Sequence, residues 1–219
     1  MDYIRYLGHS GFELSLHDTV ILIDPFFGSG IPENIKIPVL KPHLIKKADL
    51  ILITHEHRDH CDPIVIKELA ERTNAIVIGP KPVLNCIEIN ERQKIAVEIG
   101  DSFQVRGIDI TVVKASHPQS RYPVGYIIND KVRIYHAGDT YQFNEMMQID
   151  VDYAMIPIGG SYTMDVLDAA NSTKLFRAKY IIPIHYNTFE RITQDVNDFA
   201  RRVSRGKVII MKPDDSIMI

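Results

Sequence analysis

The sequence is poor in cysteine: it has only Cys61 and Cys86 among 219 residues. Two thiols cannot form the disulfide framework of a small secreted domain, and they suit a reducing compartment. The chain also lacks the basic start and apolar run of a signal peptide. No apolar run approaches the ~20 residues that cross a bilayer. These absences lead us to expect a soluble cytoplasmic protein with no membrane partner.

An excess of basic charge is missing as well, because 25 Lys and Arg face 28 Asp and Glu, a formal net charge of −3. Sequence-independent nucleic-acid binding needs a basic face, so the composition disfavours a nucleic-acid partner. A composition of 45% hydrophobic and 24% charged residues is that of an ordinary globular protein. No linker, low-complexity tract or repeat is visible, and we expect one domain over residues 1–219.

The hydrophobic patterning predicts strands and helices in both halves of the chain. Asp62 followed by Pro63 predicts the N-cap and first position of a helix. The expected helices span 42–48, 63–72, a segment from a Thr163 cap to about Arg177, and a late segment over 198–205. The expected strands span 12–16, 19–24, 49–55, 75–79, 95–99, 102–105, 108–113, 125–128, 132–136, 153–158, 180–185 and 207–211.

Histidine, by contrast, is abundant: there are nine, and three fall within residues 55–60. His55 and His57 come two apart just after a buried strand, so in extended backbone they project to the same side. Asp59 and His60 follow before the capped helix. Imidazole and carboxylate are the ligands of catalytic Zn²⁺, and four donors this close suggest two neighbouring metal sites. The alternative is a polar loop of solvated histidines, which the context of these donors disfavours.

Three other residues share the same setting, at the carboxyl end of an apolar strand. They are His117 after TVVKAS, Asp139 after VRIYHAG and His185 after YIIPI. Each alone is a weak signal, because a histidine at a strand end is often structural and an aspartate after glycine often belongs to a turn. Together they supply the ligands that a site of two metals still needs.

Several strings resemble the metallo-β-lactamase superfamily over essentially the whole chain. They are HEHRDH (55–60), SHP around His117, HAGDT (136–140) and PIHY around His185. Within the superfamily they resemble the small metal-dependent hydrolases related to L-ascorbate-6-phosphate lactonases. The strings YLGHSGFEL, LIDPFF and PIGGSYTMD are similar to that branch too.

The resemblance implies an α+β fold, a four-layer αβ/βα sandwich of two mixed β-sheets. It also implies a full ligand set. His55, His57 and His117 would hold the first metal, Asp59, His60 and His185 the second, and Asp139 would bridge them. Asp59, His60 and Asp139 are also the residues that we assign to catalysis.

Two divalent cations bridged by solvent lower the pKa of that solvent, so that a hydroxide forms near neutral pH. The two metals, two carboxylate ligands and one hydroxide leave a formal charge of +1, which favours an anionic substrate. We therefore expect a metal-dependent hydrolase acting on an ester, lactone or phosphodiester bond of an anionic small molecule. Zn²⁺ suits the ligands best, with Mn²⁺, Fe²⁺ and Ni²⁺ as alternatives.

Asp24 and His9 are candidates for supporting roles. Asp24 ends a buried strand, where the resembling family places an aspartate beside a ligand histidine; a carboxylate that accepts the far N–H of that histidine fixes its tautomer. A capped turn before Pro25 is the alternative. His9, in GHSGF, is a candidate to face the metals or to contact substrate, and the alternative is an ordinary turn histidine.

Two further functions stay open on the sequence alone. The superfamily includes tRNA-processing nucleases that share the His-x-His-x-Asp-His loop, but this chain has no basic and aromatic interleaving. A metal-binding module without turnover is the third hypothesis, although no ligand of the expected set is missing. The oligomeric state and the substrate cannot be read from the sequence.

Overall fold

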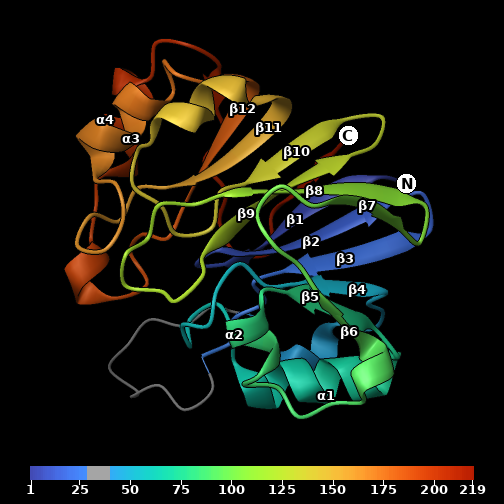
Figure 1. Cartoon of the computed structure of the whole chain (residues 1–219). Helices are drawn as coiled ribbons and strands as arrows, with labels where there is room; N and C mark the ends of the chain where they lie inside the picture. The colour runs from blue at the N-terminus through green and yellow to red at the C-terminus, as the bar shows by residue number, and fades with distance from the viewer. Residues whose placement is uncertain (29–39) are drawn as a thin grey trace. The chain divides into compact units, whose positions relative to one another are not determined.

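The structure of the chain is a computed structural model that describes residues 1–28 and 40–219. Its contacts divide the chain into two compact units. The first unit comprises Met1–Glu98, Ser120–Tyr122 and Met211–Ile219, and the second comprises Ile99–Gln119 and Pro123–Ile210. Each unit is built on one seven-stranded sheet (Figure 1).

The sheet of the first unit has the order β14-β1-β2-β3-β4-β5-β6. Strands β1, β2 and β3 follow one another in the chain and pair antiparallel. The parallel part of the sheet begins where β3 pairs with β4. Continuous apolar runs such as TVILI suit this buried parallel part. The strands are β1 (Tyr3–Gly8), β2 (Gly11–Leu16), β3 (Thr19–Ile23), β4 (Leu50–Leu52), β5 (Ile76–Gly79), β6 (Lys94–Ala96) and β14 (Ser216–Met218).

Helix α1 (Pro63–Thr73) begins where the sequence predicts it. The Asp62 carboxylate accepts the backbone N–H groups of Ile64 and Val65, and Asn74 ends the helix in the left-handed conformation at φ 57°. Its apolar side packs in a core with residues from β4 and β5. The other helical segments of this unit are short: α2 (Lys81–Leu84) and the 3₁₀ turns η1 (Pro42–Leu44) and η2 (Glu91–Gln93).

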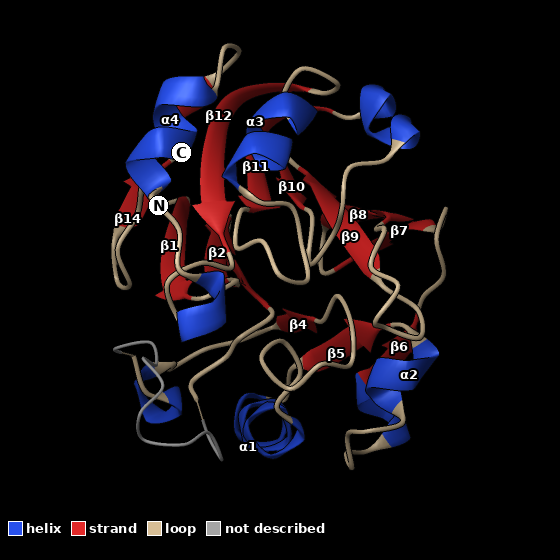
Figure 2. Cartoon of the chain, turned by 90° about the vertical axis from the view of Figure 1, so that its left-hand side faces the viewer, coloured by secondary structure: helices blue, strands red, loops and turns tan. Residues whose placement is uncertain are grey.

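The sheet of the second unit has the order β13-β12-β11-β10-β9-β8-β7. An antiparallel meander of β7 to β10 is followed by parallel strands, which the helices α3 and α4 flank in both views (Figure 2). The strands are β7 (Ser102–Val105), β8 (Ile108–Lys114), β9 (Val124–Asn129), β10 (Arg133–His136), β11 (Asp150–Pro157), β12 (Arg177–Ile184) and β13 (Lys207–Val208). The helical segments are α3 (Val166–Ser172), α4 (Val196–Arg202), η3 (Asn144–Gln148) and η4 (Glu190–Ile192).

Strand directions decide where the polar residues gather in each unit. In the second unit β8, β10, β11 and β12 all run the same way, because β8 and β10 are both antiparallel to β9 and β10 to β12 are parallel. Their carboxyl ends therefore meet at one edge of the sheet. In the first unit β3 and β4 are parallel, so the residues that follow them also share one edge.

The two mixed sheets with flanking helices are consistent with the α+β sandwich that we predicted. Three of the predicted helices are wrong in extent. Residues 42–48 form only the 3₁₀ turn at Pro42–Leu44, because Ile45 is already extended; the Arg72 guanidinium donates to the carbonyl oxygens of Pro42 and Ile45. The last predicted helix ends at Arg202 rather than at 205, because Val203 is already extended.

The helix expected from a Thr163 cap begins later and is shorter. Asp165 is its N-cap, with a carboxylate that accepts the N–H of Asp168. The Thr163 hydroxyl instead donates to the carbonyl of Gly160. The helix ends at Ser172, and Arg177 begins a strand. The last predicted strand over 207–211 pairs only through Lys207 and Val208.

Among the described residues, no helix has the length and apolar character that a membrane span requires. Both cysteines are free thiols, Cys61 buried and Cys86 exposed.

Candidate metal centre

In the first unit, the loop between β4 and α1 carries four of the predicted ligands. His55 and His60 are fully buried, while His57 and Asp59 are partly exposed. The N–H groups of His60 and Cys61 both donate to the carbonyl oxygen of His57, which winds the loop into a tight turn. The turn places the His55 ring 4.2 Å from the His60 ring and 4.6 Å from the His57 ring, centroid to centroid.

The ring nitrogens of this loop face one another closely. His55 Nε2 lies 3.1 Å from His57 Nδ1. Two imidazole nitrogens at this separation can direct their lone pairs to one ion, as the spacing of two residues predicted.

Asp24 holds the buried side of the same loop. Its Oδ2 accepts a hydrogen bond from His60 Nδ1 at 2.8 Å and one from the Thr54 hydroxyl at 2.6 Å. Its Oδ1 accepts the backbone N–H of Thr54 at 2.8 Å. Asp24 and His60 are both fully buried, so the carboxylate fixes the imidazole and leaves the opposite nitrogen, Nε2, for another partner.

His9 also lies at this loop. It occupies the turn between β1 and β2 at φ 55°, and the Tyr6 hydroxyl donates to its carbonyl oxygen. Its Nε2 lies 3.1 Å from Asp59 Oδ2, and its ring is 5.5 Å from the His60 ring. The possible ligand atoms of His9, Asp59 and His60 all lie within 4.8 Å of one another.

The remaining side chains of the loop have structural partners. Glu56 accepts the Ser120 hydroxyl at 2.8 Å and the Arg121 backbone N–H at 2.9 Å. Burial opposes ionisation of Glu56, but these hydrogen bonds and the charge of His57 lower its pKa overall. Burial also raises the pKa of the Cys61 thiol, which disfavours a thiolate ligand there.

In the second unit, Asp139 lies between the other two predicted histidines. Its Oδ2 is 3.2 Å from His185 Nε2 and 3.8 Å from His117 Nε2. All three residues are at most 3% exposed. Each follows a strand that runs in the same direction: β10 for Asp139, β8 for His117 and β12 for His185. One carboxylate oxygen shared by two imidazoles is the arrangement that a bridging ligand would show.

Hydrogen bonds fix His117 and the segment before it. His117 Nδ1 lies 3.2 Å from the carbonyl oxygen of Tyr162, so it donates there and leaves Nε2 toward Asp139. The Ser116 N–H donates to the Thr140 hydroxyl, and the Tyr141 N–H donates to the Ser116 carbonyl. The segment before His117 is thereby tied to the segment after Asp139.

Gly159 leaves room for His185. A Cβ at position 159 would lie 2.2 Å from the carbonyl oxygen of His185 and 3.1 Å from its Nδ1. The first distance is well below a van der Waals contact, so only glycine fits without movement. Gly160, at φ 72°, then turns the chain toward the Tyr162 carbonyl that binds His117.

Eight of the nine residues predicted for the site follow the ends of β3, β4, β8, β10 and β12, and His9 lies in the turn between β1 and β2. The first unit brings His9, Asp24, His55, His57, Asp59 and His60 together, and the second brings His117, Asp139 and His185 together. Their roles as ligands stay predictions. Sequence reasoning missed Thr54, Glu56 and Gly159, because their contacts are with residues distant in the chain. For these three residues the sequence held one indication, the pair Gly159-Gly160 after an apolar strand, because glycine there often marks a close approach of another backbone.

The donor set of each unit fits divalent metal ions. It consists of imidazole nitrogens and carboxylate oxygens, and Asp24 and the Tyr162 carbonyl fix two of the histidine tautomers. The ligand atoms of each unit therefore support the prediction from the sequence that this protein binds divalent metal ions.

Comparison with known proteins identifies the class to which this fold and these residues belong. The family described as "Beta-lactamase superfamily domain" matches residues 3–185. The structure is similar to that of Igni18, described as a novel metallo hydrolase from Ignicoccus hospitalis. The TM-score is 0.86 and the identity 32%, over 99% of this chain and 97% of the other. A putative metal-dependent hydrolase from Parabacteroides distasonis has a TM-score of 0.79 and an identity of 25%, over 97% of this chain and 93% of the other.

A curated relative narrows the class further. A UPF0173 metal-dependent hydrolase of Pyrococcus furiosus is 37% identical, in an alignment that covers 98% of each chain. The chain therefore belongs to the UPF0173 metal-dependent hydrolase family of the metallo-β-lactamase superfamily. This confirms the superfamily that the motifs predicted and the small metal-dependent hydrolases within it. The nearer relation to ascorbate-6-phosphate lactonases stays a prediction.

Proposed function

We propose that this protein is a binuclear metal-dependent hydrolase that cleaves an ester, lactone or phosphodiester bond of an anionic small molecule. The observation that carries the proposal is the position of Asp139 Oδ2, which both His117 and His185 approach through Nε2. The names of the relatives, metal-dependent hydrolase and metallo hydrolase, support the same class of reaction.

In this proposal the two halves of the ligand set serve one centre. His55, His57 and His117 hold one ion, Asp59, His60 and His185 hold the other, and Asp139 bridges the two. Zn²⁺ is our first choice for a mixed set of nitrogen and oxygen ligands, and Mn²⁺, Fe²⁺ or Ni²⁺ would also be accepted. Bound ions supply Lewis-acid activation of water and of the bond to be cleaved.

The protein's own contribution is to hold protons and ligands in place. The Asp24 carboxylate keeps the proton of His60 on Nδ1, and the Tyr162 carbonyl keeps the proton of His117 on Nδ1. Both imidazoles then present Nε2 in the deprotonated form that a cation requires. Two divalent ions outweigh the charge of Asp59 and Asp139, and the centre therefore favours an anionic substrate.

The resemblance to ascorbate-6-phosphate lactonases makes a lactone or ester that carries a phosphate the first substrate class to test. That choice rests on a likeness of fold and motif, and one fold can host many different reactions. A cytoplasmic location and the single domain over 1–219 remain part of the same proposal.

Metal content per chain tests the proposal most directly. We expect about two equivalents in the wild-type protein and a clear loss in Asp139→Ala, with Asp109→Ala, an exposed aspartate on β8, as the matched control. One metal that survives Asp139→Ala would overturn the bridging role. A panel of esters, lactones and phosphodiesters with the metal-loaded protein then tests turnover, and hydrolysis of none of them would contradict the substrate classes.

A further inference from the structure

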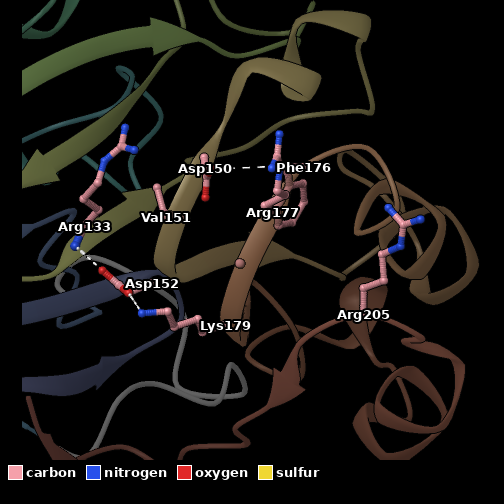
Figure 3. Close-up of a pocket in the computed structure, with 9 residues that line it drawn as sticks. Arg133, Asp150, Val151, Asp152, Phe176, Arg177, Lys179 and Arg205 are labelled. Carbon is pink, nitrogen blue, oxygen red and sulfur yellow. Dashed lines mark hydrogen bonds and ion pairs between the residues drawn. The ribbon is translucent and has the colours of Figure 1, made fainter.

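A cavity lies in the second unit, at the ends of β10, β11 and β12 opposite to those that the candidate ligands follow. It has a volume of about 430 Å³ and is lined by the first residues of three parallel strands, Arg133 of β10, Asp150 of β11 and Arg177 of β12 (Figure 3). Asp139 and His185 follow the carboxyl ends of β10 and β12. Strand β12 has eight residues, so its two ends are about 23 Å apart at ~3.3 Å per residue. The cavity is therefore separate from the candidate metal ligands of this unit.

The lining is rich in cationic side chains. Arg133, Arg177, Lys179 and Arg205 line it together with the two carboxylates Asp150 and Asp152. The cavity thus has two more cations than anions, in a protein whose net charge is −3. An excess of this kind in a concave site favours an anionic occupant.

One carboxylate is already satisfied. Asp152 accepts Lys179 Nζ at 2.6 Å and the backbone N–H of Arg133 at 2.8 Å. The bond from Lys179 and the N–H of Arg133 lower the pKa of Asp152, so it stays ionised and occupies the lysine. Asp150 lies 3.9 Å from Arg177 Nε, and both side chains are largely exposed, which makes this ion pair weak.

Arg133 and Arg205 carry the charge that no carboxylate in contact neutralises. Among the described residues, neither guanidinium has a carboxylate within ion-pair distance. Both are nonetheless held by neutral oxygens. Arg133 Nε donates to Asn129 Oδ1 at 3.0 Å, and one terminal nitrogen of Arg205 donates to the Lys174 carbonyl at 3.2 Å. A neutral acceptor orients a guanidinium without cancelling its charge. The other N–H groups of the guanidinium are left for a ligand.

We propose that this cavity binds a small molecule that carries two or more phosphate groups. A guanidinium presents parallel N–H donors that match phosphate oxygens, which is why arginine recognises phosphate so well. Figure 3 shows Arg133 and Arg205 at opposite ends of the lining with Arg177 between them. Separated guanidinium groups suit a ligand whose anionic groups are also separated, and the volume lies in the range of small-molecule sites.

Isothermal titration of the full-length protein with inorganic tripolyphosphate at low salt tests the proposal. We expect one saturable site per chain and an affinity about tenfold to a hundredfold lower in the double variant Arg133→Gln/Arg205→Gln. Arg201→Gln is the matched control, because Arg201 is an exposed arginine of the same unit that pairs with Asp195 and Asp198. Both substituted arginines are exposed, so the variants should keep the wild-type melting temperature.

Parallel titrations distinguish binding in this cavity from binding at the metal ligands or at a general cationic surface. Heat from chelation of bound metal is the same in the wild type and the arginine variants and cancels in the comparison. Binding that persists in Asp139→Ala supports a site away from the metal ligands, and binding lost in that variant would overturn the proposal. Three other results would overturn the proposal. They are orthophosphate that binds as tightly as tripolyphosphate, a double variant that binds tripolyphosphate as tightly as wild type, and a protein that binds short RNA but not tripolyphosphate.

Discussion

Asp24 and His60 are joined by a 2.8 Å hydrogen bond between two side chains that are both fully buried. The residues are 36 positions apart in the chain, and the parallel pairing of β3 with β4 brings their segments together. A buried carboxylate that binds one nitrogen of an imidazole decides which nitrogen remains for a metal. The metal affinity of His60 should therefore depend on a residue that is not itself a ligand.

Asp24→Asn should lower metal affinity by about 10- to 100-fold while the fold is kept. The asparagine Oδ1 can still accept the Thr54 N–H, and asparagine tolerates the left-handed backbone at φ 44°. Its amide nitrogen, however, cannot accept the proton of His60 Nδ1. Competition with a chelator of known affinity measures the change. Asp49→Asn is the control, since Asp49 accepts the Val20 N–H but no histidine. Equal affinities of Asp24→Asn and wild type would refute the role.

Gly159→Ala should disturb His185 without replacing any predicted ligand. The new methyl group would lie 2.2 Å from the His185 carbonyl oxygen, so the backbone of one of the two strand ends must move. Overpacking of this kind costs about 1–3 kcal/mol of the free energy of unfolding. Denaturant unfolding of the metal-free protein measures that cost, and elemental analysis should show less metal per chain.

The control for this variant is Gly100→Ala. A Cβ there meets nothing within 4 Å, and only its φ of 98° is unfavourable. We expect destabilisation with an unchanged metal content. If Gly159→Ala retained the metal content of wild type, the close approach to His185 would have no bearing on the site.

Most of the candidate ligands could be predicted from the sequence because the patterns that mark them are local. His55, His57, Asp59 and His60 fall within six residues, and the strand before them and the capped helix after them are both marked by apolar pattern and Asp62-Pro63. The strand ends before His117, Asp139 and His185 were also visible as apolar runs. The assignment of each distant residue to a metal came from the resemblance and not from spacing.

Other features depend on contacts that no local pattern shows. The 3₁₀ turn at Pro42–Leu44 ends because Ile45 is extended, and Arg72 of α1 binds the carbonyl oxygens of Pro42 and Ile45. Thr163 looked like a helix cap, yet Asp165 caps the helix because its carboxylate reaches the Asp168 N–H. Thr54 and Glu56 act through partners that are distant in the chain, so their roles follow only from the folded backbone.

Asp62→Ala should link the stability of α1 to the order of the ligand loop. Loss of an N-cap aspartate costs about 0.5–2 kcal/mol of unfolding free energy. Asp62 follows His60 by two residues, so a frayed helix start also loosens the loop and should lower metal affinity. Asp195→Ala removes the N-cap of α4 in the second unit and is the matched control. A similar loss of metal affinity in both variants would show a general effect of stability and not an effect of the loop.

Tyr3→Phe should change the response of the protein to alkaline pH. The Tyr3 hydroxyl donates to Glu13 Oε1 at 2.6 Å. Burial, together with this bond and the charge of Glu13, raises the pKa of Tyr3 from 10.0 to about 12. In the unfolded chain the phenol ionises near pH 10, so the stability that the neutral phenol provides is complete below that pH and is lost as the pH rises toward 12. Urea unfolding at several pH values above 9 should show wild type losing more free energy of unfolding than Tyr3→Phe, which has no phenol to ionise. Parallel pH profiles for the two proteins would mean that Tyr3 titrates alike in the folded and unfolded states.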